Sequence, residues 1–434
     1  MVKLAQKTQK ADAGSIGHPE LVAAIVAEIQ ATGPIPFVRF MELALYHPQF
    51  GYYMRATGDG EEQAGEHRIG WDGDYYTSSD VHPVFAKALA RQARQIDELL
   101  GRPDPFTIVE MGAGKGLLVR DVLADCEAGG GPFLDRLRYV LVERSPAMRE
   151  AQRRNLAPWL GRPDLVTWRS GLEGLDTDGV TGLFLSNELV DALPVHRIRI
   201  EGGEAKELFV DYRDGRFCER LAPLSTPALA DYLDRLARAG ITLPEGYTTE
   251  INLKAPAWMK DVARVLNRGV AITIDYGHAA RDLYGPDRRR GTLLCYHRHS
   301  VAEDPYRRVG EQDLTAHVDF SALATAGEEA GLHVTGFTNQ MSFLIGLGVE
   351  EMVGTLEPGS PEFQSVIRLL RPESMGRTFK ILIQHKGLER LELDGLRFKP
   401  FFGDVLSQAK GERHEAIGKS VASNPSPIAS SPRV

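Results

Sequence analysis

A glycine-rich stretch bounded by carboxylates carries the clearest chemistry in the sequence. It reads Glu110-Met-Gly-Ala-Gly-Lys-Gly116 and begins where the apolar run 106–111 ends. Glycines allow backbone conformations with positive φ and let a ligand approach the main chain closely. In open α/β sheets, cofactors bind in the crevice beyond the strand ends, where such a loop lies. The stretch therefore predicts a site for a nucleoside cofactor, with a plain strand-to-helix turn as the structural alternative.

The spacing of the glycines and the flanking acids narrow the choice of cofactor. A dinucleotide site would show GxGxxG, whereas this loop shows GxGxG directly after an acid, which suits a ligand with an ammonium group. A phosphate-binding loop is excluded, because Lys115 is followed by glycine rather than by Ser or Thr. Glu143 ends the next apolar run and is expected to accept hydrogen bonds from ribose hydroxyls. The expected cofactor-binding residues are Glu110, Gly112, Gly114, Gly116, Glu143 and Asn187.

A second set of polar residues, Asn187-Glu188-Leu-Val-Asp191, follows another apolar run. It would place two acids and an amide beside the cofactor crevice, and Glu188 and Asp191 share a face if this turn is helical. If the site holds a guanidinium, carboxylates of this kind would bind it bidentately and balance its charge. The alternative is that these residues form the first turn of a helix, where acidic side chains interact favourably with the positive end of the helix dipole.

Four more residues are candidates for substrate contact. Asp275 ends a further apolar run, although a strand-ending turn explains it equally well. Asp74 and Tyr76 lie in a glycine-flanked segment, where aromatic rings could wall a cation or simply pack the loop. His317 stands in a Thr-Ala-His-Val-Asp stretch, and a lone histidine is more often structural.

Metal binding and disulfides are not expected. His297 and His299 could face one way on a strand, but a third ligand at suitable spacing is not evident. The cysteines are far apart and form no CxxC pair, which favours a reducing compartment and hence the cytoplasm. They are Cys126, Cys218 and Cys295.

Helical and strand patterns alternate between the ends of the chain. Apolar residues recur at helical spacing from Phe85 to Leu100. A helix is expected over Leu117 to Cys126, and Ser145-Pro146 is typical of a helix start. The short apolar runs expected to be strands lie at 106–111, 139–142, 165–168, 182–186, 270–274 and 379–384. The alternation predicts an α/β fold, with a mostly parallel sheet covered by helices on both faces.

An insertion interrupts this alternation around 195–266. Its first part, Val195 to Leu221, reads as a β-meander with turns at Gly202-Gly203 and Asp214-Gly215. Helical patterns follow at 228–239 and 257–266. The expected organisation is a flexible tail over 1–16, a main domain over 17–400 and a disordered tail over 408–434.

Composition excludes two classes of partner. Lys plus Arg number 51 and Asp plus Glu 59, a net charge of −8, which argues against nucleic acid because phosphate binding needs a basic surface. The longest apolar runs fall well short of the roughly 20 residues that span a bilayer, so membrane insertion is not expected.

Beyond these patterns, the chain resembles the MidA-like methyltransferases from about residue 33 to 386. The matching stretches, besides the glycine loop and Ser145-Pro146, are 40–48, 51–53, 186–194, 274–277, 310–320 and 375–380. The resemblance implies a class I methyltransferase fold, Rossmann-like, with S-adenosyl-L-methionine as cofactor and a family-specific segment around 300–378. The family includes a mitochondrial enzyme of complex I assembly that methylates a protein arginine. The resemblance thus implies a protein substrate, with a complex I-type subunit as one candidate, and the mitochondrial matrix as location if the source is eukaryotic.

Within this resemblance, Glu188 is expected to orient the acceptor and Asp191 to support it. Two other functions stay open: methylation of a small molecule, and a catalytically idle assembly factor that binds a client protein. The family usually carries Thr-Ser-Pro-Glu where this chain has Thr77-Ser-Ser-Asp80, after a polar insert over 57–69. That departure leaves the choice of substrate open. The methylation pattern of the product and the oligomeric state are open as well.

Overall fold

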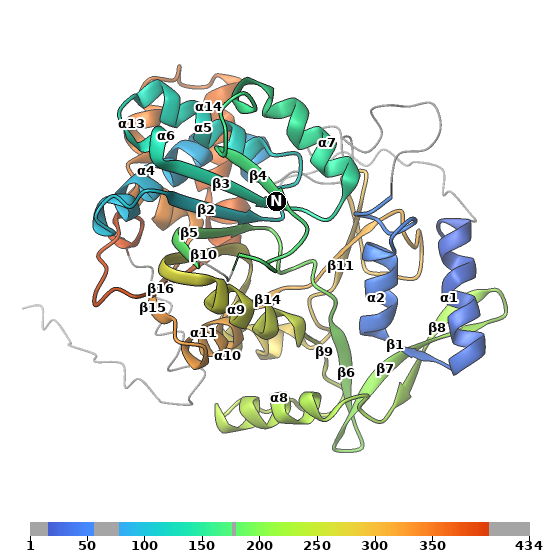
Figure 1. The fold of residues 1–434 in the computed structure, drawn as a ribbon. Helices are drawn as coiled ribbons and strands as arrows, with labels where there is room; N and C mark the ends of the chain where they lie inside the picture. Colours follow the sequence, from blue (N-terminus) through green and yellow to red (C-terminus); the bar gives the residue numbers. More distant parts are fainter. Residues whose placement is uncertain (1–15, 56–77, 176–178, 399–434) are drawn as a thin grey trace, which may run out of the picture.

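An eight-stranded sheet organises the computed structural model, which describes residues 16–55, 78–175 and 179–398 (Figure 1). Its strands are β2 (Phe106–Met111), β3 (Leu137–Val142), β4 (Val166–Arg169), β5 (Val180–Asn187), β10 (Leu266–His278), β14 (Val318–Asp319), β15 (His333–Asn339) and β16 (Phe379–Lys386). They lie in the order β15-β16-β10-β5-β2-β3-β4, with β14 paired to the end of β10. All six predicted strands are confirmed.

The sheet is mostly parallel, as predicted. Strands β4, β3, β2, β5 and β10 run parallel to one another, and β16 runs antiparallel between β10 and β15. The chain builds outward from β2 to β3 and β4 on one side and resumes at β5 on the other. This reversal opens a crevice at the carboxyl ends of β2 and β5, where α/β sheets bind their ligands.

Helices cover both faces of the sheet (Figure 1). On β2, Ile108 packs into one apolar core and Val109 into the other, because successive side chains of a strand point to opposite faces. The first core includes α4 (Val84–Leu99), α5 (Leu117–Gly129), α12 (Gln340–Gly346) and α14 (Pro361–Leu370). The second includes α9 (Lys254–Val265) and α11 (Phe320–Glu329). Shorter helices are α3 (Ser78–Val81), α6 (Phe133–Arg136), α7 (Pro146–Asn155), α10 (Ala280–Leu283) and α13 (Val349–Val353).

A second, antiparallel sheet contains the predicted meander. Its strands are β1 (Ile35–Pro36), β6 (His196–Glu201), β7 (Glu204–Arg213), β8 (Arg216–Ala222) and β9 (Thr248–Ile251). The turns between β6, β7 and β8 lie at Gly202-Gly203 and Asp214-Gly215, as predicted. Helices α1 (Pro19–Thr32) and α2 (Phe37–Tyr46) share an apolar core with this sheet, and α8 (Pro227–Arg238) packs elsewhere on it. A small third sheet holds β11 (Leu294–His297), β12 (Ser300–Ala302) and β13 (Asp313–Thr315).

Two features of the expected insertion and its sheet are not apparent from the sequence. Strand β1 joins this sheet from a segment about 175 positions earlier, by pairing Ile35 with Val210 of β7. Helix α9 falls within the expected insertion, yet it packs on the main sheet beside α11 and leads directly into β10. The domain limits stay predictions, and the tails expected over 1–16 and 408–434 lie almost entirely outside the described residues.

Close backbone approach in the main sheet depends on two glycines. Gly182 of β5 and Gly269 of β10 are register partners with φ of 145° and 148°. A Cβ atom on Gly182 would lie 2.2 Å from the carbonyl oxygen of Thr107 in β2. Replacing Gly182 therefore pushes β5 and β2 apart beneath the crevice.

We expect Gly182→Ala to lower the free energy of unfolding by about 2–3 kcal/mol, through steric overlap and backbone strain. Gly161→Ala is the matched control, because a Cβ atom there meets nothing within 4 Å, and its effect stays within about 0.5 kcal/mol. Denaturant unfolding of both variants measures the difference. Equal stability of the two variants would show that the strands tolerate the extra methyl group.

Candidate active site

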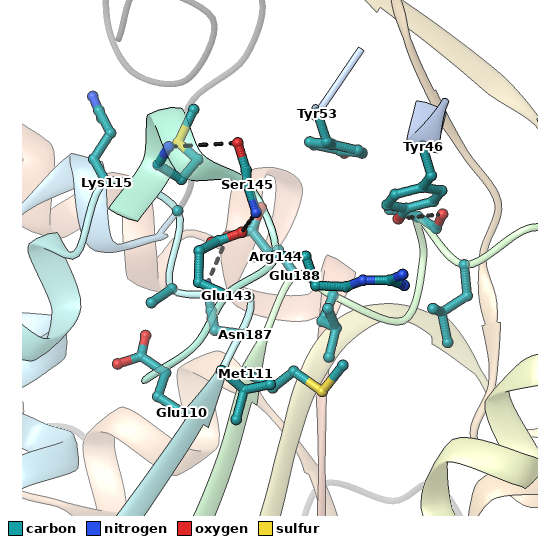
Figure 2. Close-up of a pocket in the computed structure, with 18 of the residues that line it drawn as sticks. Tyr46, Tyr53, Glu110, Met111, Lys115, Glu143, Arg144, Ser145, Asn187 and Glu188 are labelled. Atoms are coloured by element: carbon teal, nitrogen blue, oxygen red, sulfur yellow. Dashed lines mark hydrogen bonds between the residues drawn. The ribbon is translucent and has the colours of Figure 1, made fainter. Parts of the chain in front are cut away.

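A cavity of about 290 Å³ lies at the carboxyl ends of β2, β3 and β5 (Figure 2). Its walls come from the loops that follow these strands, at 112–118, 143–148 and 188–194. Helix α2 and the segment at 53–54 supply the opposite wall. The cavity thus occupies the crevice at the point where the strand order reverses, as the topology requires.

The glycine loop forms one wall and needs its glycines. Gly112, Gly114 and Gly116 have φ of 80°, 51° and 79°, in the left-handed region that side chains disfavour. A Cβ atom on Gly112 would lie only 2.9 Å from Leu189 Cδ1. Gly116 is the N-cap of α5, so the loop delivers the chain directly into that helix. The main chain is consequently bare toward the cavity, where a ligand can approach it.

Glu143 is held at the end of β3 by its own surroundings. Its Oε1 accepts a hydrogen bond from the Ser145 backbone N–H at 2.8 Å, and its Oε2 accepts one from Gln152 Nε2 at 3.2 Å. Ser145 in turn caps α7, accepting from the Met148 N–H, as expected from Ser145-Pro146. Burial raises the pKa of Glu143, against these hydrogen bonds. A carboxylate fixed in this way keeps lone pairs for the hydroxyls of a ribose.

Glu110 lies at the base of the cavity (Figure 2). It is only 2% exposed and accepts a 2.5 Å hydrogen bond from the Tyr139 hydroxyl. Burial raises the pKa of Glu110 to about 7, and the bond from Tyr139 partly opposes this. A cation bound nearby would favour the ionised carboxylate, in keeping with the ammonium group expected there.

The loop after β5 carries Glu188 and Asp191, the residues predicted to hold the methyl acceptor. Its turn is not helical: Glu188 is in the left-handed region, with φ of 55°, and donates its N–H to the Ile274 carbonyl at 2.9 Å. The Asp275 carboxylate holds the next residues, because its Oδ2 accepts from the backbone N–H groups of Leu189, Val190 and Asp191 at 3.2, 2.7 and 3.2 Å. Asp275 thus positions the loop, while its direct contact with a substrate stays a prediction.

Three donors fix the Glu188 carboxylate at the cavity. Oε1 accepts from the Ser78 N–H at 2.9 Å and from Asn187 Nδ2 at 3.2 Å, and Oε2 accepts from the Tyr276 hydroxyl at 2.9 Å. Burial raises the pKa of Glu188 to about 8, helped by the charge of Asp275. Glu188 is therefore mostly protonated at neutral pH until a cation arrives.

Asp191 lies behind the cavity wall in an acidic environment. It is 4% exposed, and within the described part of the chain its Oδ1 has no hydrogen-bond partner. Burial, followed by the charges of Asp275, Asp313 and Glu188, holds the pKa of Asp191 well above its ordinary range. We call Glu188, Asp191, Asp275 and Asp313 the acid cluster. Such a cluster is stabilised when a cation binds beside it.

Two tyrosines that sequence reasoning left unassigned form the opposite wall. The rings of Tyr46 and Tyr53 stack, with centroids 5.5 Å apart. The Tyr46 hydroxyl donates to the Ala192 carbonyl at 2.9 Å, and the Tyr53 hydroxyl donates to Asp313 Oδ1 at 2.7 Å. Both tyrosines stand in stretches that carry the family resemblance, 40–48 and 51–53, which was the one signal that could have marked them.

The remaining predicted residues are placed elsewhere. Asp74 and Tyr76 lie outside the described residues, although the neighbouring segment reaches the site: Asp80 Oδ1 pairs with Lys115 Nζ of the glycine loop at 3.2 Å. His317 lies against His278, with ring centroids 5.4 Å apart, rather than among the described residues of the cavity wall. In the described ranges, three or more His, Cys, Asp or Glu side chains are nowhere grouped to hold a metal ion. The helices described there are also too short or too polar to cross a membrane.

A Rossmann-like sheet with a glycine loop after its first strand and a fixed acid after its second defines an S-adenosyl-L-methionine-dependent methyltransferase. The chain belongs to a family of such enzymes, whose model matches residues 88–338. The resemblance to the MidA-like methyltransferases and the predicted class I fold are thereby confirmed.

Curated relatives and a crystal structure agree with this assignment. The protein arginine methyltransferase NDUFAF7 homolog, mitochondrial, of Drosophila melanogaster is 28% identical over 87% of both chains. The human protein arginine methyltransferase NDUFAF7, mitochondrial, is 28% identical over the same shares. A COG1565 superfamily member from Burkholderia thailandensis, bound to S-adenosyl-homocysteine, is 32% identical with a TM-score of 0.77, over 87% of this chain and 95% of that chain. S-adenosyl-L-methionine is accordingly the cofactor.

The part of Glu143 in cofactor binding is open to a direct test. Because a neutral amide loses the charge-assisted acceptor for ribose hydroxyls, we expect Glu143→Gln to raise the Kd for S-adenosyl-L-methionine by about tenfold or more. Glu150→Gln is the control, since Glu150 lies on the exposed side of α7 with 59% of its side chain accessible. Isothermal titration calorimetry measures both affinities. Unchanged affinity in Glu143→Gln would remove Glu143 from the cofactor site.

Proposed function

We propose that the protein methylates a guanidinium nitrogen of an arginine side chain in a protein substrate. The observation that carries this proposal is the acid cluster, which adjoins the cofactor cavity through Glu188. Two of its members, half-buried Glu188 and buried Asp191, have raised pKa values, and a bound cation would ionise them. Asn187 Oδ1 is likewise buried and has no hydrogen-bond partner among the described residues.

The chemistry of the cavity suits a guanidinium in particular. A guanidinium stays charged at all relevant pH values and offers five N–H donors in a plane. The carboxylate of Glu188 and the amide oxygen of Asn187 are acceptors for these donors, and a tyrosine face such as Tyr53 can stack on the plane. The positive charge of the methyl acceptor would offset the free-energy cost of burying several carboxyl groups close together.

Catalysis then depends mainly on alignment. The cofactor supplies a methyl group on a sulfonium: a guanidinium nitrogen bonds to the methyl carbon as the carbon–sulfur bond breaks, its electrons passing to sulfur. Glu188 and Asn187, fixed at the end of β5, hold the acceptor nitrogen in line with that bond. The nitrogen also loses a proton, and the ionised Glu188 carboxylate is the group placed to receive it. Asp191 supports the positive charge from behind.

Three further points support a macromolecular substrate inside the cell. The curated relatives are named protein arginine methyltransferases. The second sheet and helices α1 and α2 add surface next to the cavity, beyond what a small acceptor needs. The cysteines in the described residues are free, as expected in a reducing compartment. A complex I-type subunit is the first acceptor to try, in the cytoplasm or, for a eukaryotic source, the mitochondrial matrix.

Labelling from a cell extract tests this function. The purified protein is incubated with extract and S-adenosyl-L-methionine carrying a labelled methyl group, and the labelled species are identified by mass spectrometry. We expect label on arginine side chains of a protein. Glu188→Gln should lower labelling by about 100-fold, the effect of losing a general base, with cofactor affinity retained. Glu201→Gln, at the exposed end of β6, should leave labelling unchanged.

Two results would contradict the proposal. Label on a metabolite or lipid would identify a small-molecule methyltransferase. An absence of label together with no measurable cofactor binding would favour a catalytically idle assembly factor.

A further inference from the structure

A second group of side chains, all of them basic, lies on segments that neighbour those of the acid cluster. We call His278, Arg288, His317 and Lys380 the basic cluster. Arg288 Nη2 lies 3.0 Å from His278 Nε2, and the His278 and His317 rings are stacked at a tilt, with centroids 5.4 Å apart. The charge of Arg288 lowers the pKa values of the other three residues. Four separate segments meet here: the end of β10, the turn at Pro286–Arg288, the residue before β14, and β16.

The cofactor site does not account for these residues. His317 and Lys380 belong to the stretches 310–320 and 375–380, and His278 directly follows 274–277. These are three of the stretches that carry the resemblance to the MidA-like methyltransferases. Within the described residues, the cavity wall includes none of the four basic side chains. Their convergence on one place therefore calls for another explanation.

The basic cluster lies a residue or two from the groups that hold the acid cluster. Lys380 stands directly opposite Asp275 in the antiparallel pair of β16 and β10. The residue before His317, Ala316, donates its N–H to the carbonyl of Asp191 at 3.0 Å. Two positions before His278, Tyr276 donates its hydroxyl to Glu188. A ligand in contact with both clusters would need a positive and a negative group only a few residues apart.

Burial and mutual repulsion weaken the protonation of three of these bases. Burial, followed by the charges of the neighbouring bases, lowers the pKa of His278 to about 3 and that of His317 to about 4. Burial also lowers the pKa of Lys380 to about 8, and Arg288 adds to this while Asp282 opposes it. Arg288 and Lys380 thus carry the charge at neutral pH, and the imidazoles serve as neutral hydrogen-bonding groups.

One acid beside the basic cluster, Asp319, is already engaged in hydrogen bonds, and one ring nitrogen of the cluster has an unused hydrogen-bonding position. Asp319, the register partner of His278, already accepts from the Tyr232 hydroxyl at 2.6 Å and from the Ala322 N–H at 3.0 Å. His317 Nδ1 is buried and lacks a hydrogen-bond partner in the described part of the chain. His278, Arg288 and His317 are half-buried, so an anion can reach them from solvent.

We propose that the basic cluster is a carboxylate-binding subsite, which takes an acidic side chain of the substrate polypeptide close to the methylated arginine. A carboxylate accepts bidentate hydrogen bonds from a guanidinium such as that of Arg288, and it can pair with Lys380. The identity of the polypeptide as carrier of the carboxylate rests on the proposed function. The anion site itself does not, because it can be measured without any methyl transfer.

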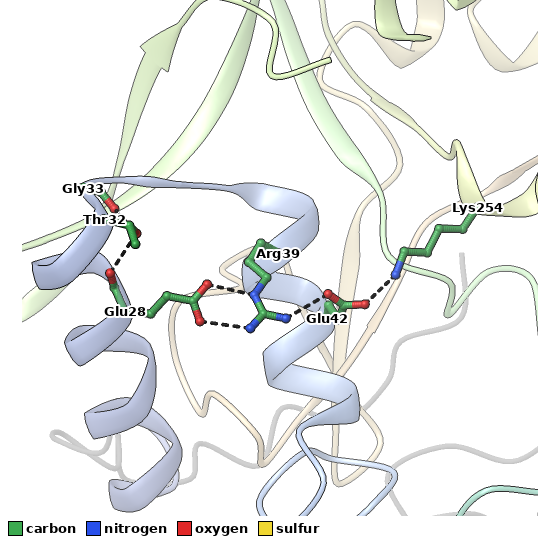
Figure 3. Close-up of polar contacts among 6 residues, drawn as sticks. All are labelled: Glu28, Thr32, Gly33, Arg39, Glu42 and Lys254. Carbon is green, nitrogen blue, oxygen red and sulfur yellow. Dashed lines mark hydrogen bonds and ion pairs between the residues drawn. The ribbon is translucent and has the colours of Figure 1, made fainter. Parts of the chain in front are cut away.

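A subsite of this kind adds selectivity to the acid cluster. An arginine followed or preceded at short range by Asp or Glu satisfies both clusters at once, whereas an arginine among basic residues meets repulsion at the second. The ion-pair chain Glu28–Arg39–Glu42–Lys254 borders the same cavity on its other side, between α1, α2 and α9 (Figure 3). Its charges are paired with one another, two acids with two bases.

The first part of the test measures anion binding in the full-length protein without substrate. Sodium acetate and sodium phosphate are compared with sodium chloride at equal ionic strength, with the midpoint of thermal unfolding as readout. We expect acetate to raise the midpoint of the wild-type protein, and Arg288→Gln to abolish that rise. Arg290→Gln is the matched control, because Arg290 belongs to the same arginine run but its side chain is 86% exposed. It should keep the rise.

The second part uses arginine peptides that differ only in a neighbouring Glu or Gln. With the wild-type protein we expect a KM about tenfold lower for the Glu peptide, and a similar kcat for both, because the subsite contributes binding remote from the reacting atoms. Arg288→Gln should raise the KM of the Glu peptide to that of the Gln peptide. If Arg288→Gln unfolds early without any anion, His317→Gln replaces it, with retained cofactor binding as the measure of folding.

The outcomes separate this inference from the proposed function. An acetate effect that depends on Arg288 supports the subsite even if labelling finds no methylated arginine. Equal midpoints in acetate and chloride, or an acetate effect that survives both variants, overturn it. Stronger stabilisation by phosphate, together with a preference for a phosphoserine peptide over the Glu peptide, also overturns the carboxylate assignment in favour of a phosphate site.

Discussion

The hydrogen bonds from three consecutive backbone N–H groups to one oxygen of Asp275 are the interaction on which the site depends. They tie the loop after β5 to the end of β10 and leave Glu188 in a left-handed conformation, with its carboxylate at the cofactor cavity. A carboxylate that accepts several backbone N–H groups orders a loop strongly, because each donor would otherwise be buried without a partner. Neighbouring β-strands of the Rossmann-like sheet thus present the cofactor loop and the acceptor loop at one edge.

This arrangement has an electrostatic consequence for the acceptor. Packing Asp275 beneath the loop brings it near Glu188 and Asp191. Burial raises the pKa values of all three, that of Asp275 to about 7 against its backbone hydrogen bonds, and the charge of Asp275 adds to the rise at Glu188 and Asp191. Under the proposed function, a guanidinium that binds beside these acids would replace their protons. The protein would then distinguish a charged methyl acceptor from a neutral one of the same shape. The proposed carboxylate subsite would extend this discrimination to the residues around the methyl acceptor.

The sequence predicted the parts of this structure that local patterns determine. All six strands, the meander turns and the glycine loop follow from apolar runs and from glycine chemistry over a few residues. The acid cluster was predicted only in part: Glu188 and Asp191 were singled out, but their turn is not helical, because Asp275 of another strand satisfies its N–H groups instead. Tyr46 and Tyr53 reach partners 146 and 260 positions away. The basic cluster brings together residues from four segments, in which Arg288 and His278 are 10 positions apart and Lys380 and Arg288 are 92 apart. Short-range patterns carry no information about such contacts.

Proton release on acceptor binding tests the central claim most directly. The complex with S-adenosyl-homocysteine is titrated at pH 7 with an arginine peptide, and separately with the same peptide carrying neutral citrulline, in buffers of different ionisation enthalpy. Because burial raises the pKa of Glu188 to about 8, the account predicts release of about one proton from Glu188 per arginine peptide bound and much weaker binding of the citrulline peptide. Binding of the arginine peptide without proton release, or equal affinity for both peptides, would contradict it.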